Sequence, residues 1–116
     1  MAIATSRAGF AHEVLIEWDH DACETLRRNA HAGSGHAGDW RIVEGDVTRH
    51  DFAQYHGRVE FISGGPPCQP FSLVGKHLGQ DDARNMFPHA VRAVREIQPK
   101  AFIFENVKGR REMPCR

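Results

Sequence analysis

The ten residues from Ser63 to Ser72, which read Ser-Gly-Gly-Pro-Pro-Cys-Gln-Pro-Phe-Ser, constrain this chain more than any other stretch. They follow directly on the largely apolar residues Val59 to Ile62, so a buried strand is predicted to end in this loop. Three prolines restrict the backbone, while the adjacent Gly64 and Gly65 are expected to let the chain turn and come close to a bound group. Ligands of open α/β sheets bind at the carboxyl ends of strands. The loop is therefore typical of one that holds the thiol of Cys68 in place as a nucleophile.

A second strand leads to an acidic residue. Asp81 to Asn85 place acids at the start of a predicted helix, and Gln98-Pro99 ends it. The apolar face of this helix is predicted to consist of Met86, Phe87, Ala90, Val91, Val94 and Ile97. Ala101 to Phe104 form a buried type of strand that leads to Glu105. Two successive strand and helix units thus bring Cys68 and Glu105 to one edge of a parallel sheet.

The first half of the chain alternates between helix and strand patterns. The predicted elements are a short helix from Met1 to Phe10 that stops at Ala8-Gly9, a strand from Glu13 to Trp18, a helix capped by Asp19 or Asp21 that packs Cys23, a strand from Trp40 to Glu44, and a helix from Val47 to Tyr55. This alternation favours the α/β class with a parallel sheet.

Two positions at strand ends have both a binding and a structural interpretation. In nucleoside-binding α/β folds, an acid at the end of the second strand accepts hydrogen bonds from ribose hydroxyls and an aromatic neighbour can stack on adenine, which suits Glu17 and Trp18. Alternatively, this pair is a capping carboxylate beside a core indole. Asp46, after the next strand, is either a ligand-binding residue or the N-cap of the helix that begins at Val47.

The string from Gly64 to Ser72, together with Phe104-Glu105-Asn106-Val107, resembles the catalytic signature of the DNA (cytosine-5) methyltransferases of bacterial restriction-modification systems. The resemblance implies that the thiolate of Cys68 adds to carbon 6 of a cytosine flipped out of double-stranded DNA. It implies that Glu105 holds the base and donates a proton during the addition. Pro67 and Asn106 are implied to shape the pocket and to align the acid.

The same resemblance implies that S-adenosylmethionine is the methyl donor. The residues expected to bind it are Glu17, Trp18, Asp46, Val47, Pro66 and Met86. No metal site is expected, because His31 and His36 lie in a glycine-rich stretch with no further ligands at usable spacing.

Composition limits the remaining possibilities. With 116 residues, 41% apolar and 26% charged, the chain is predicted to form one modest globular domain without a membrane span or secretory signal, and to be cytoplasmic. Three widely spaced cysteines do not indicate a disulfide framework. Fifteen basic residues balance fifteen acidic ones, whereas DNA-binding domains usually carry a basic excess, so much of the DNA-binding surface is expected to lie elsewhere.

The sequence also departs from the family pattern. Family members open with a strand and a phenylalanine- and glycine-rich turn, and neither precedes the helix predicted from Met1 to Phe10. The resemblance therefore implies a partial Rossmann-like, S-adenosylmethionine-dependent methyltransferase fold that lacks its first strand. Because that strand would lie at the centre of the sheet, the other strands are expected to form two pairs with unpaired edges and exposed apolar surface.

Residues 1–116 are expected to be the central part of a catalytic domain, with 110–116 as a non-native tail and with weak or no activity of the isolated chain. One alternative is half of a split methyltransferase that a complementary chain completes. An inactive remnant that binds nucleic acid or a partner is another, and an RNA cytosine-5 methyltransferase is a third.

Overall fold

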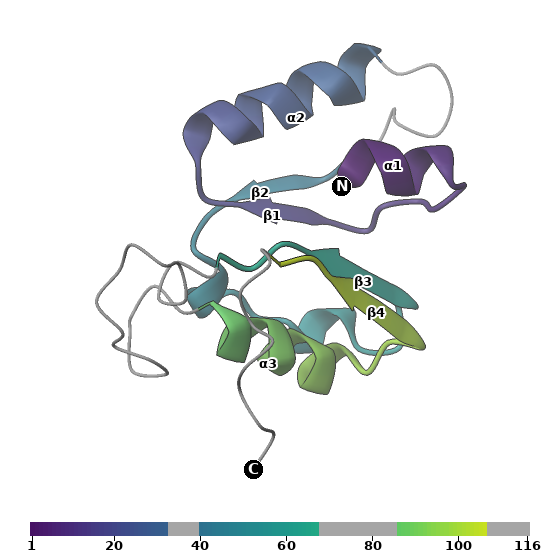
Figure 1. Ribbon diagram of the computed structural model, residues 1–116, viewed down its shortest axis with the longest axis vertical. Helices are drawn as coiled ribbons and strands as arrows, with labels where there is room; N and C mark the ends of the chain where they lie inside the picture. Colours follow the sequence, from purple (N-terminus) through teal and green to yellow (C-terminus); the bar gives the residue numbers. More distant parts are fainter. Residues whose placement is uncertain (33–39, 68–85, 107–116) are drawn as a thin grey trace. The chain divides into compact units, whose positions relative to one another are not determined.

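A computed structural model describes residues 1–32, 40–67 and 86–106, with His31 and Ala32 described by their backbone alone. The chain folds as two compact units, Met1–Asp51 and Phe52–Arg116. Helices and parallel strands alternate in both units, which confirms the predicted α/β class (Figure 1). Among the described helices, none has the length and apolar character that crossing a membrane requires.

The first unit contains a parallel strand pair and two α-helices. Its elements are α1 (Ala2–Arg7), β1 (Leu15–Glu17), α2 (His20–Ala32), β2 (Ile42–Glu44) and the 3₁₀ helix η1 (Val47–Arg49). β1 and β2 run in register from the Leu15 and Ile42 pair to the Glu17 and Glu44 pair, and α2 contacts both strands. The predicted end of the first helix is confirmed, since Ala8 is the C-cap of α1 and Gly9 has a φ of 91°.

The start of α2 and the burial of Cys23 follow the sequence prediction. Asp19 is the cap of this helix, because its Oδ1 accepts a hydrogen bond of 2.8 Å from the backbone N–H of Ala22. Cys23 is fully buried, and Ala30 and Trp40 complete the buried apolar residues described in this unit. The interior of the first unit therefore lies between α2 and the strand pair.

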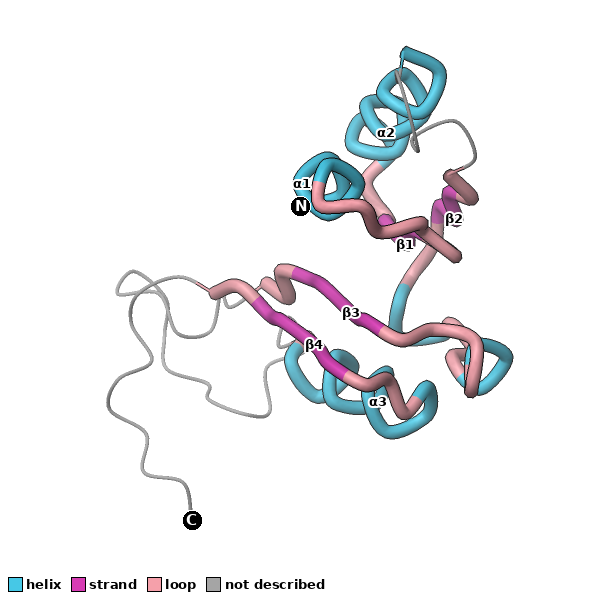
Figure 2. The backbone as a smooth tube through the Cα atoms, turned by 90° about the vertical axis from the view of Figure 1, so that its right-hand side faces the viewer, coloured by secondary structure: helices cyan, strands magenta, loops and turns pink. Residues whose placement is uncertain are grey.

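The second unit pairs β3 with β4 and packs α3 beside them. Its elements are the 3₁₀ helix η2 (Ala53–Tyr55), β3 (Phe61–Gly64), α3 (Phe87–Ile97) and β4 (Ala101–Phe104). The ring of Phe87 on α3 contacts the ring of Phe104 on β4 edge to face, with centroids 6.4 Å apart. The buried apolar residues described in this unit are Phe52, which precedes η2, Tyr55 on η2, and Ala93 and Ile97 on α3. Figure 2 shows α3 running beside the β3 and β4 pair.

The boundaries of α3 are set by local signals. Met86 is its N-cap, Pro88 lies in its first turn, and Gln98 ends it in the left-handed conformation with a φ of 53°. The predicted end at Gln98-Pro99 is therefore confirmed. The predicted start at Asp81 to Asn85 lies outside the described residues.

β3 begins and ends two residues later than the predicted strand from Val59 to Ile62. The register with β4 is the reason, because Phe61 pairs with Ala101 and Gly64 pairs with Phe104. The carbonyl oxygen of Glu60 accepts backbone hydrogen bonds from Lys100 and Ala101 and so marks the beginning of the pairing. A partner strand 40 residues away thus fixes boundaries that the apolar run alone did not.

The helix predicted from Val47 to Tyr55 is wrong, because two 3₁₀ helices separated by extended backbone replace it. The polar residues 48–51 offer no apolar stripe that could bury a continuous α-helix. Phe52 and Tyr55, by contrast, are 4% and 1% exposed. Their burial begins the second unit, so the chain changes unit between Asp51 and Phe52.

The expectation of two strand pairs is confirmed for the described part of the chain. β1 pairs only with β2 there, and β3 pairs only with β4. Phe102 and Ile103 of β4 are 56% and 53% exposed, so apolar surface of the second pair faces water, as expected for a sheet without its central strand. The prediction of a buried type of strand from Ala101 to Phe104 is therefore wrong in this structure, because no further strand is described beside the β3 and β4 pair.

One half-buried histidine links α1 to the interior of the first unit. The hydroxyl of Thr5 donates to the carbonyl of Ala2 at 2.9 Å, so it accepts from Nε2 of His12, which lies 2.8 Å away. Nδ1 of His12 is buried and has no hydrogen-bond partner among the described residues. The His12 ring also contacts the ring of Trp40, with centroids 5.2 Å apart. Burial lowers the pKa of His12 below its ordinary value of 6.5.

We therefore expect His12 to reduce the stability of the first unit as the pH falls below about 6.5. The unfolded chain binds a proton at this side chain more readily than the folded one, so the free energy of unfolding decreases from pH 7 towards pH 5. The slope should stay well under the roughly 1.4 kcal/mol per pH unit of a full proton, because the ring is only half-buried. Denaturant unfolding of the wild type and of His12→Gln between pH 5 and 7.5 measures it.

The difference between these two proteins isolates His12 from His20. Hydrogen bonding to Glu44 raises the pKa of His20, so His20 contributes stability below pH 6.5 that is lost as the pH rises. That opposite trend is present in both proteins and cancels in the comparison. Equal slopes in the two proteins would contradict the role given to His12.

Candidate active site

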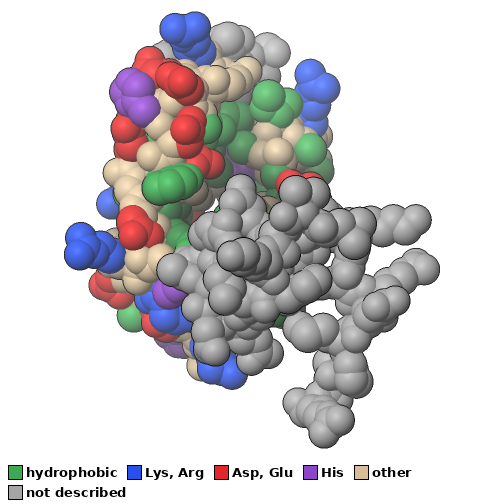
Figure 3. Space-filling view, turned by 60° about the vertical axis from the view of Figure 1, so that its left-hand side comes forward, with side chains coloured by type: hydrophobic (Ala, Val, Ile, Leu, Met, Phe, Trp, Pro, Cys, Tyr) green, Lys and Arg blue, Asp and Glu red, His purple; other side chains and the backbone are tan. Residues whose placement is uncertain are grey.

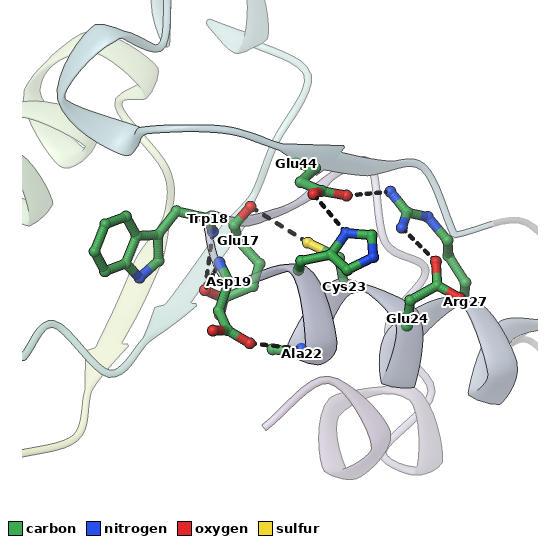
Figure 4. A network of polar contacts seen from close by, with 9 residues as sticks. Glu17, Trp18, Asp19, Ala22, Cys23, Glu24, Arg27 and Glu44 are labelled. Carbon is green, nitrogen blue, oxygen red and sulfur yellow. Dashed lines mark hydrogen bonds and ion pairs between the residues drawn. The ribbon is translucent and has the colours of Figure 1, made fainter.

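The tip of β1 presents a carboxylate that the local backbone holds in place. Oε1 of Glu17 accepts hydrogen bonds from the backbone N–H groups of Trp18, at 2.9 Å, and of Asp19, at 3.1 Å (Figure 4). No described residue bonds to its second oxygen, Oε2. Because Asp19 also caps α2, the turn between β1 and α2 fixes the orientation of this acid. Among the described residues, one oxygen of Glu17 is therefore left to bind a ligand.

The backbone of Glu17 is anchored to two neighbouring elements. Its carbonyl oxygen accepts from the N–H of Gly45, at 2.8 Å, and from the thiol of Cys23, with Sγ 3.4 Å away. Burial raises the pKa of Cys23, so the thiol keeps its proton and can donate. Sequence reasoning gave Cys23 a packing role alone and missed this bond. No local sequence pattern signals a side chain that reaches back to the preceding strand.

Trp18 does not lie in a core. Its side chain is 80% exposed, so the interpretation of a core indole is wrong. The reason is its place in the turn after β1, where Glu17 and Asp19 turn the chain into α2. A flat apolar ring beside a carboxylate is an arrangement that suits a nucleoside, with the base on the ring and the ribose hydroxyls at the acid.

Asp46 follows β2 and thus lies at the same carboxyl edge as Glu17. Its Oδ1 accepts from the backbone N–H of Thr48 at 2.8 Å, so it is the N-cap of η1, whose first residue is Val47. The capping interpretation is therefore confirmed. A ligand-binding role of Asp46 and Val47 stays a prediction.

A charged network connects α2 to β2 next to this edge. Glu44 accepts from Nδ1 of His20 at 2.9 Å and from Arg27 at 2.8 Å, and Arg27 also bonds to Glu24 at 2.7 Å (Figure 4). The hydrogen bond from Arg27 is the main cause that lowers the pKa of Glu44. Acidic side chains, with histidine among them, gather on this face of the first unit (Figure 3). The network was not predicted, because its members lie up to 24 residues apart in the sequence.

At the carboxyl ends of β3 and β4, the predicted acid Glu105 lies against Gly64 and Gly65. The backbone N–H of Glu105 donates to the carbonyl of Gly64 at 2.9 Å, which extends the pairing of β3 and β4 by one residue. The side chain of Glu105 then lies over Gly65, where a methyl carbon would be 3.0 Å from Oε1. Cys68 itself lies outside the described residues, one position after Pro67. The parallel pair therefore brings Glu105 to the backbone that leads to Cys68.

The structure describes the surroundings of the two glycines that precede Pro66. Neither Gly64 nor Gly65 has a positive φ, whereas Gly9 and Gly57 do, so a left-handed turn is not what this stretch needs. Gly65 permits a close approach of Glu105, and the predicted approach of the glycines to a bound group stays a prediction.

The predicted site residues gather at three described places. Glu17, Trp18, Asp46 and Val47 lie at the carboxyl edge of β1 and β2, and Pro66, Pro67, Glu105 and Asn106 lie at the carboxyl edge of β3 and β4. Met86 is at the start of α3. Within 1–32, 40–67 and 86–106, no group of three or more His, Cys, Asp or Glu side chains could hold a metal ion.

Comparison with known proteins identifies the family. A model of the C-5 cytosine-specific DNA methylase family matches residues 1–114. The type II methyltransferase M.NgoMIV of Neisseria gonorrhoeae is 45% identical over 108 residues, which cover 93% of this chain and 32% of that protein. M.Eco47II of Escherichia coli is 43% identical over 110 residues, which cover 94% of this chain and 25% of that protein.

M.PspPI of a Psychrobacter species is 42% identical over 110 residues, with the same coverage of 94% and 25%. The chain thus spans about a quarter to a third of the length of these relatives. The family match covers nearly all of its residues. The predicted resemblance is confirmed, and this chain belongs to the C-5 cytosine-specific DNA methylase family.

Proposed function

We propose that this chain supplies the cytosine site and the methyl-donor site of a DNA (cytosine-5) methyltransferase with a Rossmann-like sheet. The observation that carries the proposal is the contact of Glu105 with Gly65, three residues before Cys68, at the carboxyl edge of β3 and β4. Membership of the methylase family supports the assignment of the chemistry. The chain spans a quarter to a third of the length of its relatives. We therefore propose that residues outside this chain supply the other groups that contact the DNA and the methyl donor.

The residue types fit the chemistry of cytosine. Carbon 5 of the aromatic ring is a poor nucleophile and must be activated before it can be methylated. Addition of the Cys68 thiolate to carbon 6 forms a carbon–sulfur bond and pushes an electron pair towards ring nitrogen 3. Glu105 donates a proton to that nitrogen, so no full negative charge builds up on the base. Carbon 5 then has enamine character and can attack an electrophilic methyl group.

The last step restores the aromatic ring. Once carbon 5 is methylated, a base removes its proton, the carbon–sulfur bond breaks, the Cys68 thiolate leaves and the proton on ring nitrogen 3 returns to Glu105. A stacked base exposes neither face to a thiol, so the target cytosine must be flipped out of the duplex. Pro67 and Asn106, the neighbours of the two reacting groups, are proposed to shape this pocket.

The edge of β1 and β2 fits a nucleoside-bearing methyl donor. The available Oε2 of Glu17 is positioned to accept from ribose hydroxyls, and the exposed indole of Trp18 can stack on adenine. Asp46, whose Oδ1 caps η1, is proposed to accept from the adenine amino group. The further residues proposed to contact the donor are Val47, Pro66 and Met86. S-adenosylmethionine, when bound, would supply the methyl group from its sulfonium.

The test replaces the matching segment of the Neisseria gonorrhoeae relative with this chain and measures transfer of tritiated methyl groups to duplex DNA. We expect label on carbon 5 of cytosine, and weak or no transfer by the isolated 116 residues. A folded chimera that labels no DNA would contradict the proposal. Label in tRNA in place of DNA would establish the RNA alternative, and restored transfer after mixing the isolated chain with a complementary chain would establish the split enzyme.

A further inference from the structure

We propose that Gly65 is a positioning residue for Glu105: the absence of a side chain at this position leaves the space in which the carboxylate lies. This inference rests on the proposed function of Glu105 as the acid that holds the cytosine. It assigns a role to one particular glycine of the pair that precedes Pro66. The contact joins positions 40 residues apart, at the ends of two paired strands.

The space around Gly65 is filled by the Glu105 side chain. A methyl carbon on the Cα of Gly65 would lie 3.0 Å from Oε1, 3.2 Å from Cγ and 3.5 Å from Cδ of Glu105. Favourable contacts between carbon atoms are about 3.5 to 4.0 Å long, so two of these distances are too short. An alanine at this position would therefore require the Glu105 side chain to give way by a few tenths of an ångström.

The adjacent glycine provides the contrast. Among the described residues, a methyl carbon on Gly64 would meet only two ring carbons of Phe104, both at 3.6 Å, which is an ordinary contact. Neither glycine has a positive φ, so alanine brings no backbone strain of the left-handed kind at either position. The two positions thus differ in the space around them, and that space involves the proposed catalytic acid at Gly65 alone.

Little else among the described residues fixes the Glu105 side chain. Its backbone is held by the hydrogen bond to Gly64, but its exposed carboxylate accepts no hydrogen bond from the described residues. The rotamer that it adopts is then selected by the surface on which it rests, which is the backbone of Gly65. A misplacement of about 1 Å at a reacting group can cost on the order of 100-fold in rate, so this contact matters for the acid.

The first test is a thermal unfolding cycle on the 116-residue chain and on the chimera with the Neisseria gonorrhoeae relative. Gly65→Ala should lower Tm, while Gly64→Ala should lower it less or raise it, because alanine restricts the unfolded chain. In a Glu105→Ala background the Gly65→Ala change should no longer lower Tm, because the clashing atoms are gone. An equal fall in Tm in both backgrounds would overturn the proposal.

The second test measures the rate at which the chimera forms a covalent adduct with duplex DNA that contains 5-fluorocytosine. Gly65→Ala should slow adduct formation by roughly 10- to 100-fold with little change in DNA affinity, and Gly64→Ala should slow it much less. Glu105→Asp withdraws the carboxylate by one methylene, so adding Gly65→Ala to it should slow the reaction little further. Additive losses in this double variant would contradict a shared contact.

The two tests separate the possible failures. If the unaltered chimera forms no adduct, the proposed function fails, and the unfolding cycle still decides whether Gly65 makes room for Glu105. If the adduct forms but Gly65→Ala and Gly64→Ala behave alike in both tests, the function stands and the positioning role of Gly65 is refuted.

Discussion

Replacing Cys68 by serine should abolish the covalent adduct with 5-fluorocytosine DNA and reduce methyl transfer by roughly 10³-fold or more. A serine hydroxyl at its ordinary pKa is a far weaker nucleophile than a cysteine thiolate, and this substitution changes a single atom of the side chain. Fluorine at carbon 5 blocks the final loss of a proton, so an attacking thiol stays attached to the base. Denaturing electrophoresis of the chimera with labelled duplex resolves the adduct from free DNA.

Cys115→Ser is the matched control, since it makes the same chemical change at a position to which no role is given. This variant should form the adduct as the unaltered protein does. Mass spectrometry of the adduct should place the nucleotide on the peptide that contains Cys68. A nucleotide attached to any other residue, or an adduct that persists in Cys68→Ser, would refute the proposed nucleophile.

The elements that sequence reasoning predicted well depend on local signals. Asp19 caps α2 through an N–H only three residues away, and Gln98 before Pro99 ends α3. The alternation of strand and helix patterns likewise indicated the parallel pairs. These interactions join residues close in sequence, so their residue types are sufficient to predict them.

The features that were missed depend on residues far apart in the sequence. The boundaries of β3 follow from its register with β4, 40 residues later. The 3₁₀ geometry around Phe52 follows from burial in a second unit that the local pattern does not reveal. The bond from the Cys23 thiol to the Glu17 carbonyl joins a helix to the preceding strand. In each case the deciding partner belongs to another element.

The candidate site was predicted more completely as a set of residues than as a geometry. The motif from Gly64 to Ser72 predicted the loop that carries the nucleophile. The ends of the predicted strands pointed to Glu17 and Glu105 as site residues. The sequence alone could not decide whether Trp18 was buried, because an indole after a strand suits a core as well as a ligand. The contact of Gly65 with Glu105 could not be predicted from the sequence either, since a glycine in a turn usually indicates backbone freedom.

Replacing Glu105 by glutamine should lower methyl transfer by roughly 10² to 10⁴-fold, the range that a positioned acid contributes. Glutamine has nearly the same shape, so it can rest on Gly65 as the carboxylate does, but it cannot deliver a proton to ring nitrogen 3 as the thiolate adds. The side chain is exposed, so Tm should change little. Transfer of tritiated methyl groups by the chimera measures the loss.

Glu60→Gln is the matched control for this change. Glu60 is also exposed and precedes β3, but it lies where the pairing of β3 with β4 begins, and it forms an ion pair with Lys100. This variant should keep the rate of methyl transfer, because its carboxylate is at the end of the strand pair away from the Cys68 loop. If the acid acts by proton donation, the loss in Glu105→Gln should appear in the maximal rate and in adduct formation, with DNA affinity largely retained. A loss confined to affinity would instead make Glu105 a binding residue and remove the proton donor from the mechanism.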